Sequence, residues 1–77
     1  MNKNDRRELQ DYVEQLEGIK CALEEMQENE ECKLDNMPES LQESERGEAM
    51  QEAIETLEGA VNSLDEAIGY LTEITEG

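Results

Sequence analysis

The carboxylates of Asp and Glu are the most abundant side chains in this sequence that could take part in binding or catalysis. The 77 residues include 22 Asp and Glu, only 6 Lys and Arg, and no His, which gives a formal net charge of −16 at pH 7. Between residues 11 and 35, eight acidic residues recur at spacings that place them on the outer face of one helix. These residues are Asp11, Glu14, Glu17, Glu24, Glu25, Glu28, Glu31 and Asp35.

This row of carboxylates has a charge spacing comparable to that of a nucleic-acid backbone. On a helix it would extend about 36 Å and carry a negative charge roughly every 4.5 Å, against a phosphate about every 3.4 Å along one DNA strand. Such a surface could occupy the basic nucleic-acid-binding cleft of another protein. The alternative is a solvated surface that keeps a small acidic protein soluble. The sequence leaves both interpretations open.

The other reactive side chains form no catalytic or metal-binding pattern. Without His, the common arrangements of nucleophile and base are missing. Cys21 and Cys32 would lie about 16 Å apart on one helix, too far for a disulfide, and no further Cys or His completes a metal site. No EF-hand spacing is present. We therefore expect no enzyme activity, no catalytic residue, no cofactor and no metal.

The charge also limits the partners. A strongly acidic field disfavours direct binding to nucleic acid or to an anionic membrane, and it favours basic proteins. No apolar run approaches the roughly 20 residues that cross a bilayer. Free thiols suit a reducing compartment. We expect a cytoplasmic protein with no membrane and no direct nucleic-acid partner.

Helices must carry these side chains, and the second half of the chain gives the clearest helical signal. From residue 53 to 71 the pattern Ala-(Ile/Val)-x-x-Leu repeats every seven residues, and Ile74 follows it. A β-branched residue and Leu at alternating seam positions are typical of a helix that lies along another helix. The additional alanine in each heptad widens the apolar stripe beyond a two-residue seam.

The first half of the chain carries a second helical stripe. Its members alternate spacings of three and four, with Val13 beside them: Leu9, Tyr12, Leu16, Ile19, Leu23 and Met26. Asn4 or Asp5 can cap the start of this helix. Pro38 separates the two halves, and Ser44 can cap the second helix.

These signals predict an all-α fold. The chain is expected to form one helical-hairpin domain over residues 1–77, with helix one at about 5–34, a connection at about 35–43 and helix two at about 44–75. The hairpin is antiparallel and coiled-coil-like. Two helices cannot cover both stripes, so we expect a homodimer of hairpins that forms a four-helix bundle. The predicted oligomer interface consists of Ala53, Ala60, Ala67 and Ile74.

Residues 35–46, Asp-Asn-Met-Pro-Glu-Ser-Leu-Gln-Glu-Ser-Glu-Arg, and the heptads after them carry a family resemblance. The chain resembles a group of small, acidic, uncharacterised helical proteins encoded in Firmicutes phages, prophages and gut bacterial genomes. The resemblance covers most of residues 34 to 75 and brings no established activity with it. It implies a mobile-element context, in which small acidic proteins often disable host nucleases or other defence complexes in the host cytoplasm.

Two function classes follow from the sequence. The first is a non-enzymatic inhibitor whose acidic face occupies a basic nucleic-acid-binding cleft of a host defence protein. The alternative is a structural or adaptor protein that acts through helix-to-helix pairing, with its acidic residues serving solubility. The two classes differ in salt dependence, because salt screens binding between charges and leaves apolar pairing largely unaffected.

Overall fold

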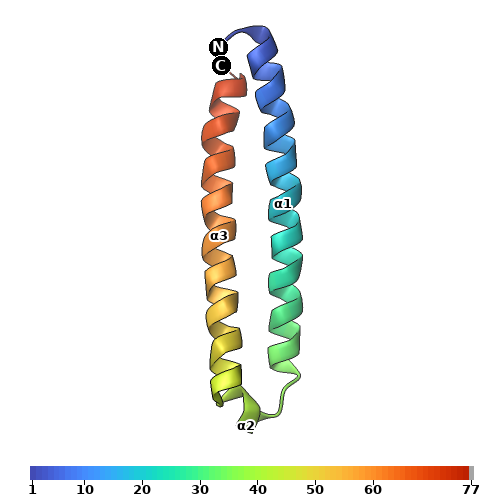
Figure 1. Cartoon of the computed structure of the whole chain (residues 1–77), viewed down its shortest axis with the longest axis vertical. Helices are drawn as coiled ribbons and strands as arrows, with labels where there is room; N and C mark the ends of the chain where they lie inside the picture. The colour runs from blue at the N-terminus through green and yellow to red at the C-terminus, as the bar shows by residue number, and fades with distance from the viewer. Residues whose placement is uncertain (77) are drawn as a thin grey trace.

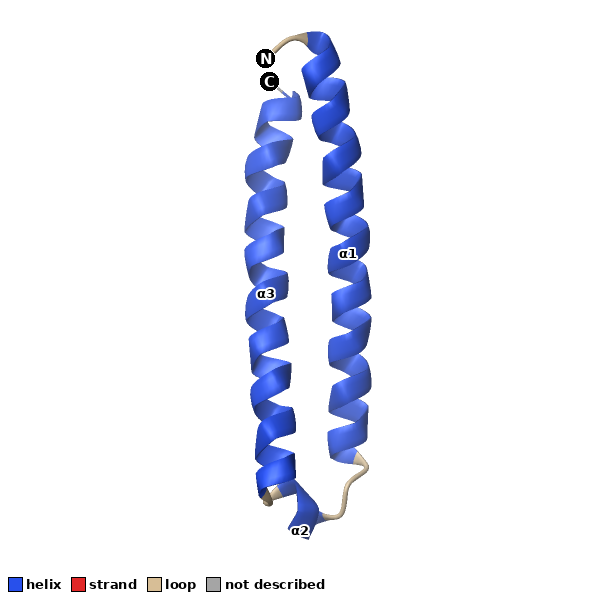
Figure 2. Cartoon of the chain, viewed as in Figure 1, coloured by secondary structure: helices blue, strands red, loops and turns tan. Residues whose placement is uncertain are grey.

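The computed structural model describes residues 1–76 and is an antiparallel helical hairpin (Figure 1). Helix α1 spans Lys3–Asp35, the short helix α2 spans Glu39–Gln42, and helix α3 spans Glu45–Glu76. The described residues contain no strand, and loops occur only at the ends and around α2 (Figure 2). Both termini lie at one end of a rod with extents of 58 × 14 × 13 Å.

Helix α1 begins two residues earlier than the sequence predicts. Its N-cap is Asn2, whose Oδ1 accepts a hydrogen bond of 2.8 Å from the backbone N–H of Asp5. The expectation that Asn4 or Asp5 caps this helix is therefore wrong. Asn2 takes the role because an Asn side chain three residues before an unpaired N–H can satisfy it, and nothing in residues 3–5 prevents the extra helical turn.

The connection contains more structure than the sequence predicts. Pro38 has φ −56° and ψ 146°, so it ends the extended segment and its carbonyl accepts the first hydrogen bonds of α2. The side chain of Gln42 donates to the Met37 carbonyl at 2.9 Å. Ser44 caps α3 as expected: its hydroxyl accepts from the Gly47 N–H at 3.4 Å and its carbonyl accepts from the Glu48 N–H at 3.0 Å.

The seam of α3 follows the predicted heptads. Its covered residues recur at spacings of three and four: Gly47, Met50, Ile54, Leu57, Val61, Leu64, Ile68, Leu71 and Thr75. Ile68 is 8% exposed, and on α1 Val13 is 3% exposed. These two are the buried apolar side chains of the described residues. The hairpin core is therefore a single thin layer between two helices.

The seam of α1 differs from the prediction at every second position. Its covered residues are Arg6, Leu9, Val13, Leu16, Lys20, Leu23, Gln27, Glu30 and Leu34. Tyr12, Ile19 and Met26, which were expected in the seam, are 49%, 52% and 59% exposed. The leucines are common to both registers. A single neighbouring helix covers only about two residues per heptad, so a wider stripe must leave one row uncovered.

Gly47 marks the closest approach in the fold. A Cβ built at this residue would lie 2.1 Å from the carbonyl oxygen of Gln42. Gly18, Gly59 and Gly69 face open space, with nothing within 4 Å of such a Cβ. Gly47 thus lets α3 pass directly beside the end of α2.

We predict that Gly47→Ala destabilises the protein by about 1–3 kcal/mol, because the backbone of Gln42 must move away from the new methyl group. Gly59→Ala is the matched control and should stabilise by roughly 0.5–1 kcal/mol, since alanine is the better helix former at an open position. Urea unfolding followed by circular dichroism measures both. Equal stabilisation by the two substitutions would contradict the close approach at Gly47.

Candidate interaction surfaces

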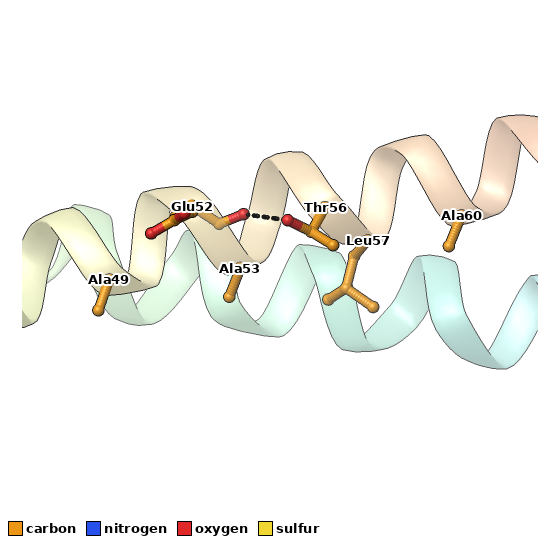
Figure 3. A pocket seen from close by; sticks show the side chains of 6 residues that line it. All are labelled: Ala49, Glu52, Ala53, Thr56, Leu57 and Ala60. Atoms are coloured by element: carbon orange, nitrogen blue, oxygen red, sulfur yellow. Dashed lines mark hydrogen bonds between the residues drawn. The ribbon is translucent and has the colours of Figure 1, made fainter.

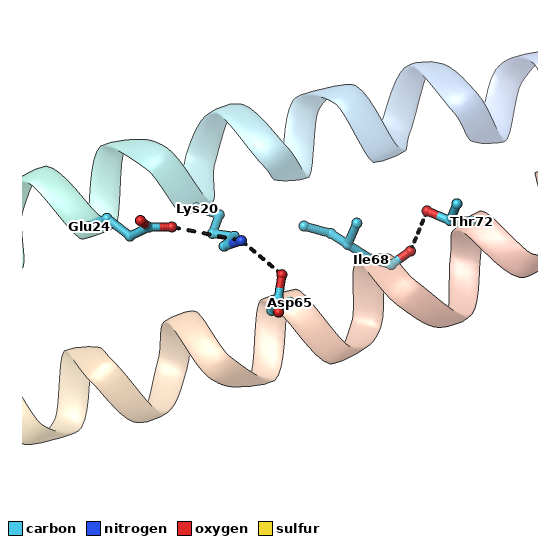
Figure 4. Close-up of polar contacts among 5 residues, drawn as sticks. All are labelled: Lys20, Glu24, Asp65, Ile68 and Thr72. Carbon is cyan, nitrogen blue, oxygen red and sulfur yellow. Dashed lines mark hydrogen bonds and ion pairs between the residues drawn. The ribbon is translucent and has the colours of Figure 1, made fainter.

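The exposed residues of the hairpin lie on two sides of the seam. Contacts between α1 and α3 show which residues of the two helices share a side. On one side, Met26 of α1 and Ala53 of α3 line the same hollow. On the other, the amine of Lys20 reaches the carboxylate of Asp65 (Figure 4). Seven residues make close to two helical turns, so residues seven apart share a side. The two contacts therefore assign sides along the length of the hairpin.

The acidic surface runs along the outer face of α1 and around its Lys20 side. It contains the eight predicted carboxylates, Asp11, Glu14, Glu17, Glu24, Glu25, Glu28, Glu31 and Asp35, none of which is in the seam. Seven are exposed and Glu24 is half-buried. Helix α3 adds Glu58 and Asp65 to this surface, and neither was predicted from the sequence, because only residues of α1 were considered. They could have been found from their position in the heptad: each directly follows a leucine of the α3 seam, and this position lies on the Lys20 side.

Lys20 is the cation within this surface, and it bridges the two helices. Its Nζ lies 2.8 Å from Oδ1 of Asp65 and 3.8 Å from Oε1 of Glu24 (Figure 4). The hydrogen bond to Asp65 raises the pKa of Lys20 above its ordinary value, although desolvation acts in the opposite direction. Close to this pair, the Thr72 hydroxyl donates to the Ile68 carbonyl at 2.7 Å.

The opposite side is uncharged in its central part, and we call it the uncharged face. Its members are all exposed: Tyr12, Gln15, Ile19, Ala22, Met26 and Asn29 from α1, and Ala49, Ala53, Thr56, Ala60, Ser63, Ala67, Tyr70 and Ile74 from α3. None is Asp, Glu, Lys or Arg, in a chain with 22 acidic residues among 77. The acid is thus segregated from this face.

The predicted oligomer interface lies within the α3 part of the uncharged face. Ala53, Ala60, Ala67 and Ile74 are all exposed, and they follow one another at seven-residue spacing along α3. The methyl groups of Ala49, Ala53 and Ala60 point the same way beside a shallow hollow (Figure 3). The α1 half of the face was missed, because its apolar residues were assigned to the seam.

Glu52 borders this face, where it lines the hollow beside Ala49, Ala53 and Ala60, and further charged residues lie toward the two ends of the face. At the end where the termini lie, a hollow is lined by Met1, Leu9 and Tyr12 together with Asp5 and Glu8. The Tyr12 hydroxyl donates to Oε1 of Glu8 at 2.8 Å, and this bond to a carboxylate raises the pKa of Tyr12.

At the end of the connection, a second hollow lies between the ends of the long helices. Its apolar lining comes from Met37, Leu41 and Met50, and its charged lining comes from Lys33 and Arg46. The two ends of the uncharged face therefore carry opposite charges.

The reactive and metal-ligating side chains of the described residues lie apart from one another. Cys21 and Cys32 are exposed free thiols on α1. Residues 1–76 hold no group of three or more His, Cys, Asp or Glu placed to share a metal ion. Over the same residues, no helix combines the length and apolar character that crossing a membrane requires. The two described surfaces therefore differ in chemistry: one presents carboxylates, and the other presents uncharged and partly apolar side chains.

The Lys20–Asp65 pair predicts a pH dependence. Since the folded pKa of Lys20 is raised above 10.5, its contribution to stability is complete below that pH and is lost as the pH rises through the raised value. The melting temperature of the parent should exceed that of Asp65→Asn at neutral pH, and the difference should shrink above pH 10.5. Glu24→Gln, with its longer contact to the same amine, is the control and should show a smaller difference. A parent–Asp65→Asn difference that is unchanged from pH 8 to 12 would contradict the assignment.

Comparison with known proteins supplies no relative from which a function could be transferred. No family model, no curated protein and no solved structure matches the chain. The function must therefore be argued from the acidic surface and the uncharged face themselves.

Proposed function

We propose that this chain is a non-enzymatic interaction protein that acts through helix-to-helix pairing, with a dimer of hairpins forming a four-helix bundle. The observation that carries the proposal is the uncharged face, where fourteen exposed residues from two helices bear no charge. In this proposal the chain acts as a structural or adaptor protein. A cytoplasmic location fits the exposed free thiols at Cys21 and Cys32.

The energetic support for pairing comes from what the single hairpin leaves exposed. Ile19 and Met26 are more than half exposed, whereas Val13 and Ile68 are the buried apolar side chains of the described residues. Full burial of a large apolar side chain contributes about 1.5–3 kcal/mol. A second layer of helices would cover the exposed row and convert a one-layer core into a bundle core. The acidic surface would remain in solvent, where its repulsion costs least.

Ala60→Glu tests this pairing, because it places a carboxylate at the centre of the uncharged face. We expect the dissociation constant of the dimer to rise at least tenfold, measured by sedimentation equilibrium at micromolar concentrations. Asn62→Glu is the matched control: it adds the same charge two residues away, on the opposite side of α3, and should leave association nearly unchanged. A parent that is a folded monomer at all concentrations would refute the proposal.

A second candidate function uses the acidic surface. Ten carboxylates from two helices line it, and of these only Glu24 and Asp65 contact the amine of Lys20. A charge density comparable to that of a phosphate backbone suits the basic nucleic-acid-binding cleft of another protein. In the mobile-element context that the family resemblance implies, this partner would be a host defence protein. Dimer formation and this function are compatible, since they use opposite sides of the hairpin.

Replacing Glu24, Glu25, Glu28 and Glu31 with Gln tests the second function. The variant keeps side-chain size and helix propensity but removes four charges from the acidic surface, reducing the net charge from −16 to −12. We expect binding to a basic partner recovered from a bacterial lysate to fall at least tenfold, and DNA to displace the parent from that partner. The affinity of the parent for this partner should itself fall as the salt concentration increases, and the difference between parent and variant should become smaller.

The matched control for this experiment removes four outward charges from α3 instead. Glu52, Glu55, Glu66 and Glu73 changed to Gln give the same net charge of −12, starting from −16. This control should retain most of the affinity, because its carboxylates lie outside the acidic surface. If the α1 variant binds as tightly as the parent, the mimicry of nucleic acid is wrong. Equal losses in both variants would show that only net charge matters.

A further inference from the structure

The uncharged face has a direction, because its two ends differ in charge. Asp5 and Glu8 lie at the end with the termini, and Lys33 and Arg46 lie at the end with the connection. All four side chains belong to exposed residues. Lys33 has one partner on its own helix, Oε1 of Glu30 at 3.6 Å, and its side chain remains 71% exposed. These charges are therefore available to a molecule seated on the face.

Two copies can place their uncharged faces together in two ways that preserve twofold symmetry. In a parallel pair, the connections lie at the same end and α1 of each copy faces α3 of the other, so Lys33 approaches Arg46 of the second copy and the acidic ends approach each other. In an antiparallel pair, the connection of one copy lies over the termini of the other. Lys33 of α1 then approaches Asp5 and Glu8 of the second α1, and Arg46 of α3 lies beside this contact, over the last turn of the second α3. Electrostatic complementarity favours the antiparallel pair at both ends.

Shape supports the same arrangement. The connection end has a hollow lined by Met37, Leu41 and Met50, in which Leu41 is exposed. The termini end offers Met1 and Tyr12, both exposed beside the other hollow. An antiparallel pair brings these apolar groups together within each patch of opposite charge. A parallel pair would instead stack each hollow on its own copy.

The length of the rod allows an interface of ordinary size. The side that bears the uncharged face is 58 Å long and 14 Å wide, so a second copy that covers all of it would cover a projected area close to the roughly 800 Å² that each partner contributes to a standard protein interface. The centre of this face is free of the charged side chains that such interfaces exclude from their cores.

We infer that the second copy docks on the uncharged face in the antiparallel orientation, with α1 on α1 and α3 on α3 and the connection of each hairpin over the termini of the other. This inference rests on the proposed helix pairing and names its partner and geometry. The apolar centre supplies the association, and the oppositely charged ends select the orientation.

The inferred geometry fixes which residues meet at the symmetry axis. If Lys33 lies over the Asp5–Glu8 turn of the second α1, the axis crosses α1 midway between them, at about residue 20, between Ile19 and Ala22 of the uncharged face. The contact between Lys20 and Asp65 places Ser63 of α3 at nearly the same height. In the antiparallel pair, Ala22 therefore lies near Ala22 of the second copy, and Ser63 near Ser63. In the parallel pair, Ala22 instead lies near Ser63 of the second copy.

Cross-linking distinguishes these pairings. In full-length protein with both native cysteines changed to Ser, we would introduce Ala22→Cys alone or Ser63→Cys alone and treat each with a short bismaleimide linker. We expect each variant to form covalent dimers at least ten times faster than protein that keeps only Cys32, which lies on the outer face of α1 and reports random collision. Circular dichroism would verify that each variant is folded.

The results separate the orientation from the pairing itself. Sedimentation equilibrium on the same variants measures association, and a monomer would overturn the proposed function. A dimer in which neither variant cross-links faster than the Cys32 control would overturn the antiparallel orientation while leaving the pairing intact. Rapid cross-linking only in a mixture of Ala22→Cys and Ser63→Cys would assign the parallel pair instead.

Discussion

A helix with one neighbour can bury only one narrow strip of its surface, and this constraint organises the whole molecule. The strip that α1 and α3 share takes about two residues from each heptad. Everything else on the two helices must face solvent or another molecule. The hairpin accommodates this by burying Val13 and Ile68 in the seam and leaving a second apolar row, with Ile19 and Met26, outside it.

Charge decides how the remaining surface is divided. With a formal net charge of −16, the carboxylates repel one another, and they are least costly where they face water and lie apart. Yet they are not spread evenly around the hairpin, because one side has no charged residue along its central length. Solubility alone would not require the carboxylates to be kept off one side of the hairpin. An acidic protein with one side kept free of acid can meet two different kinds of partner, one through charge and one through apolar contact.

The sequence predicts the helical hairpin but only part of its surfaces. On α3 the repeat Ile54, Val61 and Ile68 with the intervening leucines indicates one register, and the structure has that register. On α1 the leucines at 9, 16 and 23 fit two registers equally, since Tyr12, Ile19 and Met26 lie on one flank and Val13, Lys20 and Gln27 on the other. Hydrophobicity favours the first set, whereas packing against α3 selects the second. The choice depends on the neighbouring helix, so α1 alone could not reveal it.

The same limitation explains which surface residues were found. The carboxylates of α1 follow from helical periodicity within one segment, and all eight lie outside the seam. Glu58 and Asp65 join them only because the chain turns back on itself. The alanines of α3 were identified from their heptad spacing, but their neighbours across the seam on α1 were not. The helical turn at Glu39–Gln42 depends on local bonds to Pro38 and Met37 that periodicity does not encode.

The two ends of the chain lie beside each other at one end of the rod, and this has an architectural consequence (Figure 1). The polypeptide enters and leaves the hairpin at nearly the same point, while its connection lies at the far end of a rod 58 Å long. Such a unit could be carried in a surface loop of a larger protein without pulling the flanking segments apart. It would then stand out as a rigid spur, and whatever binds its tip would be held several nanometres from the protein that carries it.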